Sequence, residues 1–376
     1  MGKQTLTVVI FVALGGFLLL KPLQGADAPT PIAPAIPAPP FELEHRVSDP
    51  KRPVRPNRQK YKGPIIDTLL HVFPPQEADV DDKILAEIVK GIHRAGVELA
   101  VFSPTPNDAR LSGFASLAAL RNRLVEMGGG AVQSYCGAGY LSNWLHRAYR
   151  DGYSEAELER ILQRLSVDLD SGLYIGVGEL GLYHFDKTGR QYLIEFPPNF
   201  APFIGIVDLI ARKQAWLHLH AEPVHPKGKS YEREVFGGLE LLLGRNPNLK
   251  LILSHTGMTS PANARQLLNR YPALMMNIKI VNEQEHWQHL EPITNGQREL
   301  YEDWARLLEE MPKRFVIGTD MKFFRRGAFT QEYTKRIKRF RNILGTLNQK
   351  AARMIAFENA RHMFGDAQYH KQHAQN

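Results

Sequence analysis

From about residue 63 onward, apolar runs of strand length alternate with segments that have the spacing of amphipathic helices. We predict strands at 65–72, 97–104, 131–138, 174–181, 215–221, 250–255, 274–280 and 314–319. Helices are predicted near 80–95, 110–127, 154–171, 200–213, 232–244, 261–271, 298–311 and 331–362. Near-continuous apolar strands separated by helices indicate a parallel sheet that is covered on both faces. The repeated unit therefore predicts an α/β fold, a single-domain (β/α)₈ TIM barrel. An open doubly wound sheet is the alternative, but no G-x-G-x-x-G motif follows the first strand to support a dinucleotide site.

The barrel domain is predicted to span 63–366, followed by a polar tail at 367–376. Before it, Lys3, the apolar run 5–20 and Ala26-Asp27-Ala28 have the pattern of a cleaved signal peptide over 1–28. A Pro-rich and then basic linker occupies 29–62. We therefore expect an exported protein, periplasmic or secreted. An uncleaved N-terminal anchor is the alternative, and only then would a membrane be a partner, although the run is shorter than the roughly 20 residues of a bilayer span.

The net charge of +8 is unevenly spread, with Lys and Arg concentrated at 46–62 and 322–341. A nucleic-acid or anionic membrane surface is one interpretation, and a solvated linker and helix face is the other. Neither run interleaves aromatic residues that would stack on bases, so the sequence favours the second interpretation and argues against a nucleic-acid partner. The single cysteine, Cys136, lies within a predicted strand and is interpreted as a buried structural thiol.

Five predicted strands carry, near or directly after their C-terminal end, a residue that can bind a metal. These residues are His71, Glu179, His220, His255 and Asp320. The C-terminal ends of barrel strands meet at one mouth, so these side chains are expected to share one site. Imidazole and carboxylate ligands suit a divalent transition metal, with zinc the first choice and manganese the alternative. Such an ion would lower the pKa of a water molecule, and Asp320 would accept its proton as general base. His218, two residues before His220, is expected to point inward one layer deeper.

These motifs resemble the amidohydrolase superfamily, especially the amidohydrolase-related and TatD-type metal-dependent hydrolases. The resemblance covers about 64–365 and rests on Asp67-Thr-Leu-Leu-His71, Gly178-Glu-Leu-Gly181, His220-Ala221, Ser254-His255 and Gly318-Thr-Asp320, with Phe357-Glu-Asn-Ala-Arg361 similar to the family's closing helix. It implies that Glu179 bridges two metals, that His220 and His255 bind the second metal, and that Asp320 is both ligand and base. His71 matches the second histidine of the family's first-strand His-x-His motif.

Leu69 stands where the resemblance implies the first histidine of that motif. A leucine has no lone pair to offer, so we expect one tightly held metal on Glu179, His220 and His255 rather than a binuclear centre. Replacing Leu69 with histidine is then expected to raise the metal content. A catalytically silent binding barrel is the competing interpretation.

The expected activity is hydrolysis of an ester, lactone or amide of an anionic small molecule by metal-activated water. Lys322, Arg325 and Arg326 follow Asp320 and are candidates for binding the anion. The loop after His220, which contains Glu222, is polar enough to line the mouth. A TatD-type phosphodiester hydrolase, or nuclease, is the enzymatic alternative, but Tyr183 stands where such members often carry an aspartate after the glutamate.

Overall fold

The computed structural model describes residues 43, 59–72, 82–104, 114–185, 192–280, 292–295, 299–323 and 330–365. The signal-like segment, the Pro-rich linker, Arg325, Arg326 and the polar tail lie outside these residues. Ala38–Asn376 forms one compact unit, which contains the whole barrel. Among the described helices, none is long and apolar enough to span a membrane.

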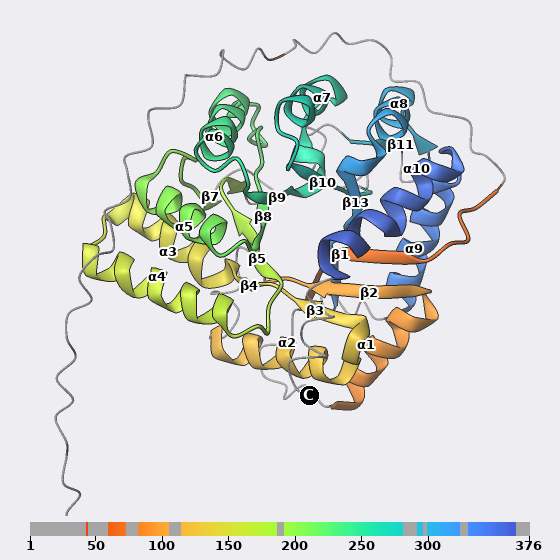
Figure 1. Cartoon of the computed structure of the whole chain (residues 1–376), viewed down its shortest axis with the longest axis horizontal. Helices are drawn as coiled ribbons and strands as arrows, with labels where there is room; N and C mark the ends of the chain where they lie inside the picture. The colour runs from red at the N-terminus through yellow and green to blue at the C-terminus, as the bar shows by residue number, and fades with distance from the viewer. Residues whose placement is uncertain are drawn as a thin grey trace, which may run out of the picture. The chain divides into compact units, whose positions relative to one another are not determined.

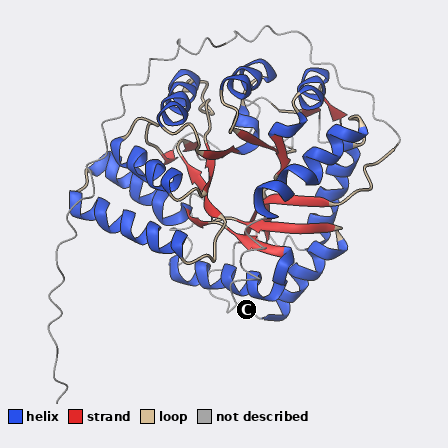
Figure 2. Cartoon of the chain, in the orientation of Figure 1, coloured by secondary structure: helices blue, strands red, loops and turns tan. Residues whose placement is uncertain are grey.

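The fold is a (β/α)₈ barrel, as the alternating pattern predicts. The main sheet has ten strands in the order β3-β2-β1-β13-β10-β9-β8-β5-β4, with β14 attached to β1. β3 and β4 are two pieces of one strand on either side of Tyr135, so setting β14 aside leaves eight barrel strands. Every pairing in this sheet is parallel. Figure 1 shows the strands as a ring with the helices outside it, and Figure 2 shows the same two layers by colour.

The strands lie within or close to their predicted ranges. They are β1 (Ile65–Val72), β2 (Val97–Phe102), β3 (Val132–Ser134), β4 (Cys136–Gly137), β5 (Gly176–Gly181), β8 (Trp216–His220), β9 (Lys250–Leu253), β10 (Met275–Ile278) and β13 (Phe315–Ile317). β14 (Met321–Phe323) was not predicted and lies where a loop was expected after the last strand. Two short antiparallel hairpins that the pattern did not predict pair β6 (His184–Phe185) with β7 (Tyr192–Ile194) and β11 (Thr294–Asn295) with β12 (Glu299–Leu300).

The helices surround the sheet: α1 (Asp82–Arg94), α2 (Phe114–Gly128), α3 (Ala138–Asp151), α4 (Glu155–Asp170), α5 (Ala201–Arg212), α6 (Glu232–Arg245), α7 (Pro261–Arg270), α8 (Glu302–Glu310), α9 (Thr330–Leu344) and α10 (Gln349–Arg353). The helix prediction was wrong in two places. α3 was missed because the apolar strand pattern continues to residue 138, whereas Gly137, with φ of 80°, turns the chain into a helix. The predicted helix 331–362 is broken after Leu344, where a Cβ on Gly345 would lie 2.0 Å from the Gln59 carbonyl oxygen.

The interior of the barrel is apolar at one end, and the polar candidate residues lie at the other end, where the strands terminate. Buried residues of the barrel strands pack together with Ala360 and Phe364 from the C-terminal helical segment, and this cluster includes Ile66, Val101, Tyr135, Ile252 and Val316. Cys136 is buried, as expected for a structural thiol. Because the N-terminal half of the barrel is filled by side chains, chemistry is confined to the opposite, C-terminal ends of the strands.

Candidate metal centre

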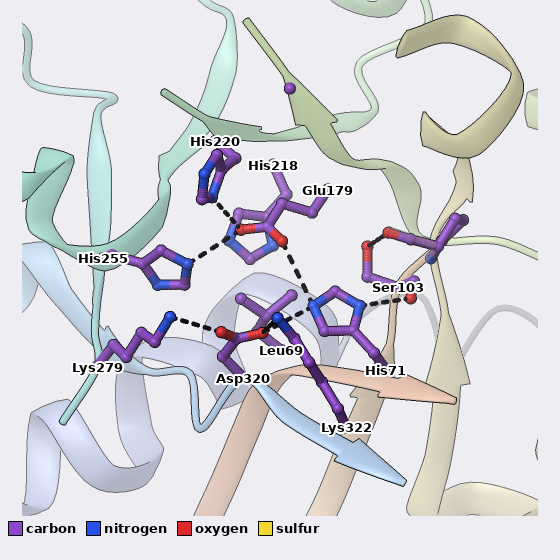
Figure 3. A network of polar contacts seen from close by, with 12 residues as sticks. Leu69, His71, Ser103, Glu179, His218, His220, His255, Lys279, Asp320 and Lys322 are labelled. Carbon is purple, nitrogen blue, oxygen red and sulfur yellow. Dashed lines mark hydrogen bonds and ion pairs between the residues drawn. The ribbon is translucent and has the colours of Figure 1, made fainter. Parts of the chain in front are cut away.

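The five residues at the strand ends meet in one buried group at the mouth of the barrel (Figure 3). They come from β1, β5, β8 and the segments that follow β9 and β13, and each is 6% exposed or less. Glu179 is at the centre. Its Oε1 lies 3.2 Å from His220 Nδ1 and 3.3 Å from His255 Nε2, while its Oε2 lies 3.4 Å from His71 Nε2. Asp320 joins through Oδ1, 3.0 Å from the same nitrogen of His71.

Local backbone structure brings these side chains into position. A Cβ on Gly178 would lie 2.5 Å from the Cβ of His218, so the glycine before Glu179 lets β5 approach β8 closely. His255 and Asp320 have φ angles of 56° and 49°, in the left-handed region that costs a non-glycine residue about 1–3 kcal/mol. Such strain is concentrated at functional sites, where the surrounding structure maintains it.

Asp320 is held in its strained conformation by hydrogen bonds on both sides. Its own N–H donates to the Leu69 carbonyl at 3.0 Å. The preceding residue, Thr319, donates from its N–H and its hydroxyl to the buried carboxylate of Asp67, at 2.9 and 2.6 Å. Tyr333 of α9 donates to that same carboxylate at 3.1 Å. Asp67 therefore lies outside the group but fixes the loop that carries Asp320.

The tautomer of His71 shows that a cation fits this group. Its Nδ1 lies 2.9 Å from the Ser103 carbonyl, which can only accept a hydrogen bond, so Nδ1 carries the proton. The lone pair on Nε2 of the neutral ring then faces the carboxylates of both Glu179 and Asp320. A nitrogen lone pair and a carboxylate oxygen repel each other unless a proton or a metal ion lies between them. Burial alone would lower the pKa of His71, but hydrogen bonds to Asp320 and Glu179 outweigh burial and raise it to about 9.

His220 is in the same situation between two carboxylates. Its Nδ1 faces Glu179, and its Nε2 lies 3.2 Å from Oε1 of Glu222. Burial lowers its pKa, yet the charge of Glu179 and hydrogen bonds to Glu179 and Glu222 raise the pKa to about 9. An imidazole that donates its outer N–H to a carboxylate presents its inner nitrogen to a metal, and this pairing orients the ring and strengthens the ligand.

His255 is a neutral ring with a lone pair available. Burial, followed by the positive charge of Lys279, lowers its pKa to about 3. Burial raises the pKa of Glu179, but the charge of His220 and hydrogen bonds from the three imidazoles hold it well below its usual value. The ligand atoms of Glu179, His220 and His255 all lie within 4.8 Å of one another, as do those of His71, Glu179 and Asp320. This donor set fits a divalent transition metal.

Two residues at the site, Lys279 and His184, were not predicted, and a third, Glu222, was predicted only as part of a polar loop at the mouth. Lys279, just after β10, places its Nζ 2.6 Å from Oδ2 of Asp320. Glu222 was placed only in a polar loop, yet it is fully buried behind His220. His184, on the hairpin strand β6, donates from Nδ1 to Glu222 at 2.6 Å. A lysine inside the apolar run 274–280 was a usable signal for Lys279, whereas nothing in the sequence pattern pointed to His184.

The other candidates fall around this group. Lys322, which pairs with β1 through β14, has its Nζ 3.6 Å from Oδ1 of Asp320. His218 is fully buried below the group, with Nε2 2.8 Å from Nδ2 of Asn277. Leu69 is fully buried, and Figure 3 shows it against the group beside Asp320 and His71.

Comparison with known proteins supports the fold. No protein-family model matches the chain, and no curated protein is significantly similar in sequence. Among solved structures, an uncharacterized TIM-barrel protein of Bordetella bronchiseptica is 13% identical, with a TM-score of 0.51 over 81% of this chain and 99% of that one. The 4-oxalomesaconate hydratase of Rhodopseudomonas palustris is 13% identical, with a TM-score of 0.50 over 83% of this chain and all of that one (100%). The dihydroorotase of Saccharomyces cerevisiae, in complex with 5-fluoroorotic acid, is 12% identical, with a TM-score of 0.51 over 81% and 84%. These likenesses, all at 13% identity or less, show that the chain shares the TIM-barrel fold.

Proposed function

We propose that the protein is a metal-dependent hydrolase of the amidohydrolase type that acts on an ester, lactone or amide of an anionic small molecule. The observation that carries the proposal is the buried carboxylate of Glu179, whose described side-chain partners are the imidazoles of His71, His220 and His255. A carboxylate and three imidazole nitrogens, gathered from separate strands, form a ligand set for a divalent cation.

Each side chain has a distinct role in this proposal. Glu179, His220 and His255 hold the ion, and His71 faces it from β1. A divalent zinc or manganese ion, when bound, supplies Lewis acidity that makes a water molecule acidic enough to act at neutral pH. Asp320 accepts the proton from the attacking water. Burial raises the pKa of Asp320, but the charges of Lys279 and Lys322 hold it well below its usual value, so the carboxylate is ionised and ready to accept.

The position of Lys322 at the mouth supports an anionic substrate. Lys322 is 29% exposed at its side chain, beside the nearly buried Asp320. An ammonium group at the edge of a metal site attracts a carboxylate or phosphate group of a ligand. Arg325 and Arg326, which follow in sequence, are further candidates for the same role.

The test begins with metal analysis of the purified protein, stripped with a chelator and reconstituted with zinc or manganese. The proposal expects one tightly retained ion per chain and hydrolysis of carboxylate-bearing lactones, esters or amides that is lost with the chelator and restored by the metal. Cleavage of single-stranded DNA instead would indicate the phosphodiester hydrolase. Failure to retain stoichiometric metal after reconstitution would identify the chain as a binding barrel without metal chemistry.

A further inference from the structure

The side of the metal centre next to Asp320 is occupied by a lysine. Lys279 extends from the end of β10, and Figure 3 shows its ammonium group directed at Asp320. The distance from Nζ to Oδ2 is 2.6 Å, and the Lys279 side chain is only 12% exposed. This is a short, charge-assisted contact in a largely dehydrated position.

The two oxygens of Asp320 therefore have different partners. Oδ1 lies 3.0 Å from His71 Nε2, and Oδ2 lies against Lys279. Lys322 is more peripheral, because its Nζ is 3.6 Å from Oδ1 and its side chain is 29% exposed. A buried carboxylate needs a positive partner, and Lys279 meets that need without any ion.

Position 69 offers no ligand for a second metal beside His71 and Asp320. Leu69 is fully buried beside His71 and Asp320, and its side chain has no lone pair. A second ion here would have to bind through His71, Asp320 and a shared oxygen of Glu179, while displacing an ammonium group from Oδ2. The absence of a ligand at position 69 and the presence of a cation at position 279 thus both disfavour a second metal ion.

We propose, building on the single-metal centre of the proposed function, that the Lys279 ammonium group permanently takes the place of a second metal ion beside Asp320. The centre then consists of one divalent cation on Glu179, His220 and His255 and one fixed organic cation on Asp320. Lys279 supplies positive charge and a hydrogen bond to the base but cannot activate water itself. Lys279 is accordingly a positioning residue that orients and neutralises Asp320.

With Lys279 beside Asp320, Leu69→His is expected to leave the metal content unchanged. From the sequence alone, that substitution is expected to raise the metal content. With Lys279 in place it is insufficient, because the ammonium group still occupies Oδ2 of Asp320. A second ion requires two changes: a ligand at position 69 and removal of the cation at position 279.

The experiment compares the full-length protein with L69H, K279M, L69H/K279M and two matched controls, L69H/K279R and L69H/K322M. Each protein is stripped, reconstituted with manganese, desalted and analysed for metal per chain, with circular dichroism and thermal unfolding to verify folding. We expect one ion in every protein except L69H/K279M, which should hold two. The arginine control keeps a cation at position 279, and the Lys322 control removes a lysine that lies farther from the carboxylate.

Electron paramagnetic resonance gives a second measurement that does not depend on activity. Two manganese ions that share Glu179 would be exchange-coupled in L69H/K279M, whereas the other proteins would show isolated ions. Two ions in the unmodified protein, two ions in L69H alone, or a single ion in folded L69H/K279M would each overturn the role of Lys279. An unmodified protein that holds no ion at all would overturn the proposed function itself, so the two failures are distinguishable.

Discussion

The two sides of the candidate metal centre use similar residues, but the partners of the central carboxylate differ between them. Glu179 is surrounded by imidazoles, and behind His220 a further carboxylate, Glu222, accepts the outer N–H. Asp320 has one imidazole and two ammonium groups, and behind His71 there is a neutral backbone carbonyl. On the Glu179 side, negative charge exceeds fixed positive charge, and our proposal places the metal ion there. On the Asp320 side the chain provides two ammonium groups, and our proposal places no ion there.

The largest effect on this contrast is expected from Glu179→Gln. The amide keeps the shape of the side chain but removes the charge that all three imidazoles face. Metal affinity should fall by more than about 100-fold, beyond the 10–100-fold typical of residues that only support a ligand. Competition with a chromophoric chelator would measure this loss. Retention of a full equivalent of tightly held metal would show that Glu179 is not the central ligand.

Asp320→Asn should affect catalysis without affecting metal binding, and so distinguish the two sides of the site. Because Glu179, His220 and His255 remain, the variant should still retain one ion per chain. Turnover of any substrate found in the screen should fall by about 10²–10⁴-fold, the usual contribution of a general base. Initial rates at saturating substrate, with metal content measured on the same samples, would test this. If the variant lost its metal ion together with its activity, Asp320 would be a ligand of that ion, which contradicts the proposed single-metal site on Glu179, His220 and His255.

Asp67→Asn should act on the Asp320 side through stability. The Asp67 carboxylate accepts from the Thr319 N–H at Oδ1 and from the Thr319 hydroxyl and Tyr333 at Oδ2, and an amide nitrogen in place of either oxygen would face a donor instead of accepting from it. The free energy of unfolding should fall by about 3 kcal/mol. Urea unfolding monitored by tryptophan fluorescence would measure the change. Tyr333→Phe removes only one donor and should cost about 1 kcal/mol, and equal losses in the two variants would contradict this account.

Glu222→Gln should weaken the Glu179 side alone. Glu222 accepts from His220 Nε2 and is held in turn by His184 and the backbone N–H of Phe185. Removing its charge should lower metal affinity by about 10-fold, at the small end of what such supporting carboxylates contribute. The exposed residue Glu159 on α4 offers a matched control, Glu159→Gln, that should leave affinity unchanged. Equal affinity in Glu222→Gln and the control would show that Glu222 does not orient His220.

The fold was largely predictable because its determinants are local. Each apolar run forms a strand and each amphipathic segment forms a helix, and the chain order of these units is also their order around the barrel. The errors lie where tertiary contacts override the local pattern. At Gly345 the backbone of Gln59, far away in the sequence, requires a residue without a side chain, and the helix predicted across it is broken.

For the candidate site, the sequence by itself determined that the five residues at the strand ends gather in one group and that a leucine stands at position 69, because a barrel directs successive strand ends to one mouth. Only the tertiary structure brought Lys279 to Asp320, placed Glu222 and His184 behind His220, and tied Asp67 to Thr319 and Tyr333. These contacts depend on which rotamers and which neighbouring elements meet in a low-dielectric interior. Whether a buried carboxylate is neutralised by an ion or by a lysine is decided by distances of a few ångströms between residues far apart in the chain.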